Sequence, residues 1–241
     1  MIKIIALNIL KIFDYYHQKK IINFLKKRGY KNFDTLFDVG AHHGESIKLF
    51  SKNFNIKNLY SFEPSFDNFM ILKKNLKKLK KMFSKTDIKI ENFAFGSENK
   101  SLTMKHMSES SSSTINDINV KSKYFKKKSF FLYKKKNQNF FKEENIIQKK
   151  IRDYISENKI LNIDFLKIDT EGYEFNVLRG FENDLSKVSL IMFEHHYHNM
   201  IIKKYKFRDI NNMLVKNNFR QLYKSKMPFR KTFEYIYGRE E

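Results

Sequence analysis

The sequence predicts an α/β domain in which a mostly parallel sheet is covered by helices on both faces. Short apolar segments that resemble strands alternate with amphipathic segments that resemble helices along most of the 241 residues, a pattern typical of this fold class. Residues 35–50 form a strand, a glycine turn and a helix, and the second strand ends at an acidic residue, Glu63. A strand, a turn and a helix in this order make a nucleotide-sized crevice at the carboxyl end of a parallel sheet.

Residues 2–28 predict an N-terminal helix, because apolar residues form one side of it and Gly29 ends it. We therefore divide the chain into an N-terminal helical segment, residues 1–32, and an α/β domain, residues 33–241. The helix is expected to lie across the sheet or to cover the active site. The alternative, which the lysine-rich end of the helix favours, is contact with an anionic membrane. The sequence has no window of ~18 apolar residues and no signal-peptide pattern, so we expect a cytoplasmic protein with peripheral membrane contact as an option.

The glycine turn after the first strand has the pattern Gly40-x-x-x-Gly44, not the G-x-G-x-x-G of dinucleotide-binding proteins. His42 takes the place of their second glycine, so a pyrophosphate would have poor access to the main chain. Gly40 lacks a Cβ and lets a ligand approach, and the start of the following helix offers N–H groups to a carboxylate. An ordinary turn with a structural glycine is the alternative.

Glu63 ends the second strand, where an acidic side chain can accept hydrogen bonds from both hydroxyls of a ribose. A helix over residues 65–80 and a strand over 87–93 should follow. Asn92 and Ala94 at the end of that strand could hold an adenine, although packing of the loop would also explain them. A ligand with a ribose and a carboxylate but no diphosphate fits S-adenosylmethionine. The residues expected to bind this cofactor are Asp38, Gly40, Ala41, Gly44, Glu63, Asn92, Ala94 and Asp169.

An insertion at about residues 107–150 follows a short strand expected at 102–104. Its serine run, residues 108–113, is either a flexible lid or a linker. Residues 120–150 are rich in lysine, interleaved with tyrosine and phenylalanine. Basic residues with exposed aromatics can bind single-stranded nucleic acid. We favour a cap over the site that packs its aromatic side chains inward.

The second half of the chain continues the alternation of strands and helices. We expect helices at residues 151–158, 174–185 and 207–217, and strands at 163–168, 188–193, 219–225 and 231–237. The strand at 163–168 ends in an acidic segment, Asp169 to Glu174, and the next strand ends in Glu194-His195-His196. Because parallel strands end at one edge of a sheet, these polar tips should gather beside the glycine turn.

Polar strand tips supply groups for acid–base or metal chemistry. A hydroxyl that accepts a methyl group must lose its proton, so a general base helps. His195 has a suitable unperturbed pKa, and Asp169 and Glu171 are its rivals. A divalent metal ion that lowers the pKa of the hydroxyl is a further option, with Asp169, Glu171 and Glu194 as candidate ligands. Helix capping is the structural alternative for each carboxylate.

The composition bounds the partners only loosely. The chain has no cysteine, so it has neither disulfides nor thiolate metal sites. Its net charge of +22 is compatible with a nucleic-acid or membrane partner. However, only seven of its 48 basic residues are arginine, and abundant Lys, Asn, Ile and Phe are what an AT-rich genome encodes. We favour this second explanation.

Several motifs resemble the FkbM-type methyltransferase family. They are Phe37-Asp38-Val39-Gly40-Ala41 through Gly44, Ser61-Phe62-Glu63-Pro64, Asn92-Phe93-Ala94, the serine run, and Lys167-Ile168-Asp169-Thr170-Glu171-Gly172-Tyr173-Glu174 followed by Val177-Leu178-Arg179-Gly180. The resemblance covers about residues 33–195. It implies a Rossmann-like class I fold with seven strands in the order 3-2-1-4-5-7-6. It also implies S-adenosylmethionine as methyl donor and O-methylation, often of a sugar or glycan.

From the residues and the resemblance together we expect an O-methyltransferase that acts on a carbohydrate hydroxyl. The enzyme alternative is an RNA methyltransferase, which the positive charge favours. The non-enzyme alternative is a methyltransferase-like domain that only binds a glycan, a membrane or a nucleic acid. The expected partner is a sugar or glycan acceptor, without a specific nucleic acid and with peripheral contact with an anionic membrane as an option.

Overall fold

The computed structural model describes residues 2–107, 113–132 and 141–240, with side chains from residue 13 onwards except in segment 130–132. Its centre is a seven-stranded sheet in the order β11-β12-β9-β8-β1-β2-β3. Numbered along the chain, this is the order 3-2-1-4-5-7-6 expected for the family. All neighbours are parallel except those of β12, which runs antiparallel to β9 and β11. The predicted fold class is therefore confirmed.

The strands of the central sheet are β1 Asn32–Val39, β2 Asn55–Phe62, β3 Asp87–Glu91, β8 Ile163–Ile168, β9 Val188–His196, β11 Phe219–Lys226 and β12 Thr232–Arg239. The helices are α1 Ile2–Lys27, α2 Glu45–Asn53, α3 Phe66–Met82, α4 Lys123–Leu132, α5 Ile151–Glu157, α6 Glu174–Arg179 and α7 Phe207–Lys216, with a 3-10 helix η2 at Glu182–Lys187. The remaining strands are β4 Ala94–Gly96, β5 Lys100–Met107, β6 Asp117–Ile118, β7 Phe141–Lys150 and β10 Ile201–Ile202.

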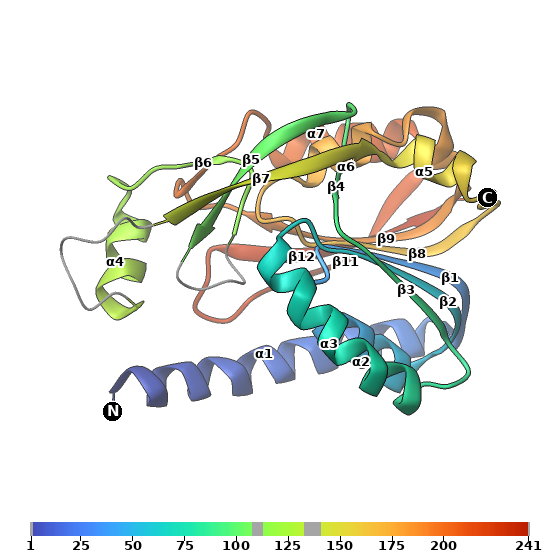
Figure 1. Ribbon diagram of the computed structural model, residues 1–241, viewed down its shortest axis with the longest axis horizontal. Coiled ribbons are helices and arrows are strands. Elements are labelled where there is room, and N and C mark those ends of the chain that lie inside the picture. Colours follow the sequence, from blue (N-terminus) through green and yellow to red (C-terminus); the bar gives the residue numbers. More distant parts are fainter. Residues whose placement is uncertain (1, 108–112, 133–140, 241) are drawn as a thin grey trace.

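Helices cover both faces of the sheet, as Figure 1 shows. Helices α1, α2 and α3 lie on one face, where Leu25, Ile47 and Leu72 join a core with the sheet residues Leu36 and Phe165. Helices α5, α6 and α7 lie on the other face, where residues such as Ile151, Val177 and Ile210 pack on the opposite sides of the same strands. Because side chains alternate along each strand, those on one face of the sheet pack into one core and those on the other face into a second.

Helix α1 runs across the first face of the sheet and reaches the β11–β12 hairpin. His17 pairs with Glu234 of β12 at 2.7 Å, and the ring of Phe24 stacks on Tyr223 of β11. The expectation that this helix lies across the sheet is confirmed. No helix in the described part of the chain has the length and apolarity to cross a bilayer.

The insertion builds a small sheet of its own, in the order β4-β7-β5. Its strand β5 is longer than the expected strand at 102–104, and strand β7 was not expected at all. Within the insertion, Phe125 of α4 is buried and Tyr124 stacks on His198, in line with inward packing. Residues 108–112 of the serine run lie outside the described residues.

The expected helix at 174–185 is divided near Gly180, where a Cβ would approach the carbonyl oxygen of Gly96 to 2.1 Å.

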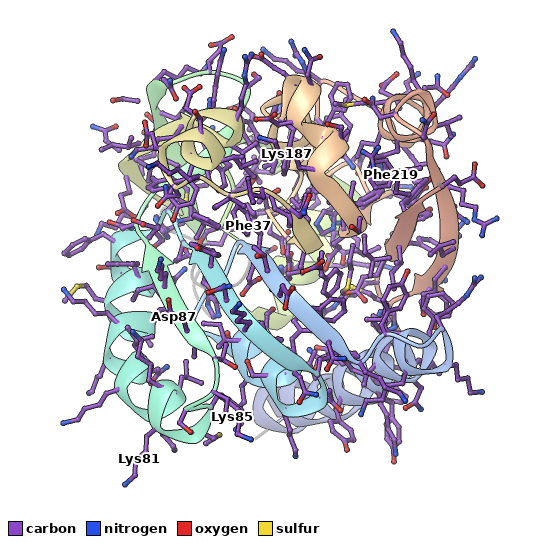
Figure 2. The ribbon with its side chains drawn as sticks, turned by 90° about the vertical axis from the view of Figure 1, so that its right-hand side faces the viewer. Phe37, Lys81, Lys85, Asp87, Lys187 and Phe219 are labelled. Carbon is purple, nitrogen blue, oxygen red and sulfur yellow. The ribbon has the colours of Figure 1, made fainter. Side chains whose placement is uncertain are left out.

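The amino ends of the strands lie opposite the site. Figure 2 views the molecule from this side, where Asp87 and Phe219 begin β3 and β11 and Lys187 precedes β9. Because six strands run in one direction, their carboxyl ends meet at the far edge. Register brings the tips together: Asp38 lies opposite Lys167, and Val39 opposite Ile168.

Candidate functional site

A cavity of about 550 Å³ opens at the carboxyl ends of β1, β2 and β8. The glycine turn after β1 lies in the middle, because β1 is between β2 and β8 in the sheet. We call the half beyond β2 the β2 side, with Glu63, Pro64 and residues 93–95. We call the other half the β8 side, with residues 169–171. The predicted residues Gly40, Ala41, Glu63, Ala94, Asp169 and Glu171 line this cavity.

Gly40 is required by the close approach of two loops. Its φ of 86° is in the left-handed region, and a Cβ at this position would lie 1.9 Å from the carbonyl oxygen of Asp169. The N–H groups of Gly40 and Ala41 both donate to the carbonyl oxygen of Phe62, at 2.9 and 3.0 Å. The turn thus joins the tips of β1, β2 and β8. The sequence suggested that this glycine gives a ligand access to the main chain. In the structure, the close approach of the two loops is by itself a sufficient reason for a glycine here.

Gly44 plays a separate part, because it starts helix α2 with φ 95°. Its missing Cβ faces Leu72, at 3.0 Å, and it does not line the cavity. In the same turn Glu45 accepts the N–H of His43 at 3.1 Å. Burial raises the pKa of Glu45, but the adjacent His42 outweighs it and lowers the pKa to about 2. The helix start therefore presents a carboxylate to the cavity rather than only free N–H groups.

Glu63 is held at the β2 side by main-chain donors. Its Oε2 accepts from the N–H of His42 at 2.8 Å, and its Oε1 accepts from the N–H of Ser65 at 3.0 Å. The side chain is only 4% exposed, and burial raises its pKa, although the two N–H groups partly oppose this. Each oxygen keeps acceptor capacity toward the cavity. A fixed carboxylate of this kind can receive the two hydroxyls of a ribose.

Some residues after β3 support a neighbouring loop, and others line the cavity. The amide of Asn92 donates to the carbonyl oxygens of Glu63 and Pro64, at 2.8 and 3.1 Å, and Asn92 does not line the cavity. Asn92 therefore fixes the loop that carries Glu63. Phe93, Ala94 and Phe95 form an apolar wall on the β2 side, which suits the face of a flat base.

Lys167 connects the carboxylates on β1 and β8. Its Nζ lies 3.0 Å from Asp38 Oδ1 and 3.5 Å from Asp169 Oδ2, and it donates to the carbonyl oxygen of Gly40 at 3.2 Å. Burial disfavours its charge, but the two carboxylates outweigh burial and raise its pKa. Asp38 is fully buried and does not line the cavity. Asp38 thus acts on the site through Lys167. A lysine inside an apolar strand was the sequence signal for this residue, and it was missed.

The loop after β8 is shaped by buried hydrogen bonds. Glu174 accepts from the N–H of Gly172 at 2.8 Å and from Thr170 Oγ1 at 3.1 Å, and Tyr205 donates its hydroxyl to the same carboxylate. Glu171 has a φ of 49°, an uncommon conformation for a residue with a side chain. Its carbonyl oxygen accepts from Thr114 Oγ1 at 2.7 Å. The loop therefore holds Glu171 in a fixed direction.

Glu171, Glu194 and His196 form a cluster on the β8 side, in which Glu171 is partly buried and the other two are buried. His196 Nε2 lies 3.1 Å from Glu171 Oε2 and 3.4 Å from Glu194 Oε1. Burial lowers the pKa of His196, but Glu171 and Glu194 outweigh it and raise the pKa to about 9. Burial, reinforced by Asp169, raises the pKa of Glu194 well above its usual range. Of the three predicted metal candidates, Glu171 and Glu194 belong to this cluster, whereas Asp169 is paired with Lys167.

His195 does not reach the cavity, and the expectation that it converges with Asp169 and Glu171 is wrong. Successive side chains of a strand point to opposite faces. His195 therefore faces the α7 side, with Tyr205 and Phe207 at ring-centroid distances of 5.9 and 5.6 Å. Burial lowers its pKa to about 3. The same alternation, applied to the sequence, would have placed Glu194 with His196 instead.

Some lining residues come from distant parts of the chain. Asp14 and Tyr15 of α1 and Arg230 of the β11–β12 turn line the cavity, and Arg230 Nη2 lies 2.8 Å from Asp14 Oδ2. The N-terminal helix thus reaches the cavity as well as crossing the sheet. No sequence signal indicated the pair, because its members are 216 residues apart.

Comparison with known proteins gives a consistent result. The sequence model of the methyltransferase FkbM domain matches residues 38–221. The structure is similar to the FkbM methyltransferase of Methylobacillus flagellatus KT, at 15% identity and a TM-score of 0.56, over 85% of this chain and 43% of that one. The chain thus spans less than half the length of that protein. No curated protein is similar enough to count as a match.

Two further solved structures are similar to this fold. One is the magnesium protoporphyrin IX methyltransferase of Synechocystis PCC 6803 with bound S-adenosylmethionine, at 9% identity and a TM-score of 0.52, over 95% of this chain and 81% of that one. The other is a protein of the NADB-Rossmann superfamily from Streptococcus agalactiae, at 12% identity and a TM-score of 0.50, over 93% of this chain and 68% of that one. At these identities the likeness establishes the fold.

Proposed function

The chain belongs to the FkbM methyltransferase family, and on this premise we propose that it transfers a methyl group from S-adenosylmethionine to a hydroxyl of a sugar or glycan. One observation carries the proposal. A single cavity holds Glu63, a carboxylate placed to bind a ribose, on one side of the glycine turn, and the carboxylates of Asp169 and Glu171 on the other side. The β2 side suits the nucleoside of the donor. The β8 side suits a hydroxyl that must lose a proton.

The residues of the β2 side fit S-adenosylmethionine. Glu63 would receive the ribose hydroxyls, and the wall of Phe93, Ala94 and Phe95 would cover the adenine. The methionine part carries an ammonium group, for which Glu45 offers a carboxylate at the glycine turn. A pyrophosphate would meet this carboxylate instead of free N–H groups. The donor set therefore favours this cofactor over a dinucleotide.

Methyl transfer to a hydroxyl requires alignment of the two reacting groups and a proton acceptor. S-adenosylmethionine supplies a methyl group that is already activated by its sulfonium. The chain must hold the acceptor hydroxyl in line with it and take up the hydroxyl proton. We assign the proton to Asp169, because its carboxylate is 38% exposed and its nearest cation, Lys167, is 3.5 Å away. Glu171 is instead occupied by the buried His196.

The charge of the cavity favours a neutral acceptor over RNA. Among the described lining residues, the carboxylates outnumber the permanently charged cations, Lys167 and Arg230, and both cations are paired. The lining carboxylates are Asp14, Glu45, Glu63, Asp169 and Glu171. A phosphate group would be repelled by such a lining, whereas sugar hydroxyls can donate hydrogen bonds to it.

Labelled donor tests this proposal. The purified protein is incubated with S-adenosylmethionine carrying a radioactive methyl group and with fractionated glycans, RNA and protein from cells. We expect label in the glycan fraction, and a loss of about 10²–10⁴-fold in turnover for Asp169→Asn, the usual range for removal of an acid–base group. The matched control is Asp153→Asn in the first turn of α5, which does not line the cavity. Label in RNA alone would support the RNA methyltransferase instead, and label in no fraction would support a binding domain.

A further inference from the structure

The cluster on the β8 side brings three potential metal ligands to one point. The ligand atoms of Glu171, Glu194 and His196 all lie within 4.8 Å of one another. They come from two elements, the loop after β8 and the end of β9. Glu194 and His196 share a face of β9 because they are two residues apart. Register therefore fixes two of the three donors, and the strained loop at Glu171 supplies the third.

His196 is oriented by its other ring nitrogen. Its Nδ1 lies 3.0 Å from Thr232 Oγ1, and Thr232 lies directly opposite His196 in the β9–β12 pair. When Nδ1–H donates to this hydroxyl, the Nε2 lone pair points at the two glutamates. This is the arrangement by which proteins fix a metal-ligating histidine. Nε2 is buried and makes no hydrogen bond of acceptable geometry, although two carboxylates lie close to it.

We propose that Glu171, Glu194 and His196 bind a first-row divalent transition-metal ion such as Mn²⁺. An imidazole ligand beside two carboxylates disfavours Mg²⁺ and Ca²⁺, which prefer oxygen ligands, and favours Mn²⁺, Fe²⁺, Co²⁺ or Zn²⁺. Three protein ligands leave coordination positions open, as in catalytic metal sites. Glu171 lines the cavity, so the three ligands lie at the edge of the space for the acceptor.

The second group of this kind among the described residues is a weaker candidate. His42, His43 and Glu45 also bring ligand atoms within 4.8 Å, but Glu45 is exposed and the histidine rings make hydrogen bonds within the turn and to helix α3. His42 Nδ1 lies 3.2 Å from Glu45 Oε1, and His43 Nε2 lies 3.2 Å from Asn68 Oδ1. This group offers a single carboxylate at an open surface, and we assign no ion to it.

The role of the ion rests on the proposed methyl transfer. A divalent ion at the β8 side would bind the acceptor hydroxyl and lower its pKa, and Asp169 would then receive the proton. Binding of the ion itself does not rest on that reaction. It is therefore tested without donor or acceptor.

Electron paramagnetic resonance of Mn²⁺ tests the site directly, because the signal of free Mn²⁺ falls when the ion binds. The metal-stripped protein is titrated with Mn²⁺, and its melting temperature is followed in parallel. We expect one ion per chain and a higher melting temperature with the ion present. Affinity should fall roughly tenfold or more in Glu194→Gln and His196→Ala, since even supporting residues of metal sites carry effects of 10–100-fold.

The adjacent histidine supplies the matched control. His195→Gln changes the neighbouring buried residue of the same strand, which faces away from the cluster, and should keep Mn²⁺ affinity. His43→Gln excludes the group at the glycine turn in the same way. If His196→Ala fails to fold, the isosteric Glu194→Gln decides. Absence of Mn²⁺ binding in the wild type, or equal affinity in Glu194→Gln, would overturn the proposal. Donor binding, measured separately with chelator present, would then still stand.

Discussion

The two sides of the cavity hold their carboxylates by different means. On the β2 side, Glu63 is fixed by main-chain N–H groups within its own and the neighbouring turn. On the β8 side, Asp169 and Glu171 are fixed by charged side chains, Lys167 and His196. The first arrangement needs only local backbone geometry. The second needs residues of several strands in register.

This difference explains a division of duties. Main-chain donors keep a carboxylate in place without neutralising it, which suits recognition of neutral ribose hydroxyls. Side-chain cations, and a metal ion if one binds, tune the charge of a carboxylate, which suits proton transfer at the acceptor. The β2 side should therefore determine donor affinity, and the β8 side should determine turnover and the stability of the buried charges.

The largest effect on the β8 side is expected from Lys167→Met. This change leaves Asp38 fully buried without its cation, and breaking one partner of a buried pair costs about 3–5 kcal/mol. Urea unfolding followed by circular dichroism measures the loss. Lys89→Met, in an exposed pair with Asp87, is the control and should change the free energy of unfolding by less than about 1 kcal/mol.

A second variant supports the same explanation. Adding Asp38→Asn to Lys167→Met should recover part of the stability, because the orphaned charge is removed. A Lys167→Met protein as stable as the wild type would show that the Asp38–Lys167 pair does not stabilise the β8 side.

The next effect in size is expected at the junction of the two sides. Gly40→Ala places a Cβ against the carbonyl oxygen of Asp169, so it should cost about 2–4 kcal/mol from the left-handed conformation and overpacking together. Gly29→Ala is the matched control, because Gly29 has a similar φ of 88° but open space around its Cβ position. It should cost only about 1–2 kcal/mol. Equal losses in the two variants would remove the loop crossing as the reason for Gly40.

The smallest effect is expected from the outer surface, whose charge is opposite to that of the cavity. Lysines crowd the exposed side of α3, and Lys81 near its end extends from the body of the molecule (Figure 2). We predict weak RNA binding by fluorescence anisotropy that disappears near physiological salt, because each neutralised phosphate releases counterions. A salt-resistant, sequence-selective complex would make the surface, rather than the cavity, the acceptor site.

The sequence predicted the β2 side far better than the β8 side, and the reason is physical. A glycine turn and an acidic strand tip act within a few residues, so Gly40 and Glu63 could be recognised from spacing and the fold from strand alternation. Lys167 and His196 act across strands, and their roles depend on register. Asp14 and Arg230 meet only because α1 crosses the sheet to the β11–β12 hairpin, which no local pattern records.

Donor affinity in two matched variants tests the division between the two sides most directly. S-adenosylhomocysteine is titrated by calorimetry into the wild type, Glu63→Ala and Glu171→Gln in one buffer. We predict one site per chain, with a loss of about 1–3 kcal/mol in Glu63→Ala, the cost of lost hydrogen bonds to a charged group. Glu171→Gln should stay within roughly twofold of the wild type, as expected for independent sites. Equal affinity in the wild type and Glu63→Ala, or an equal loss in both variants, would contradict the account.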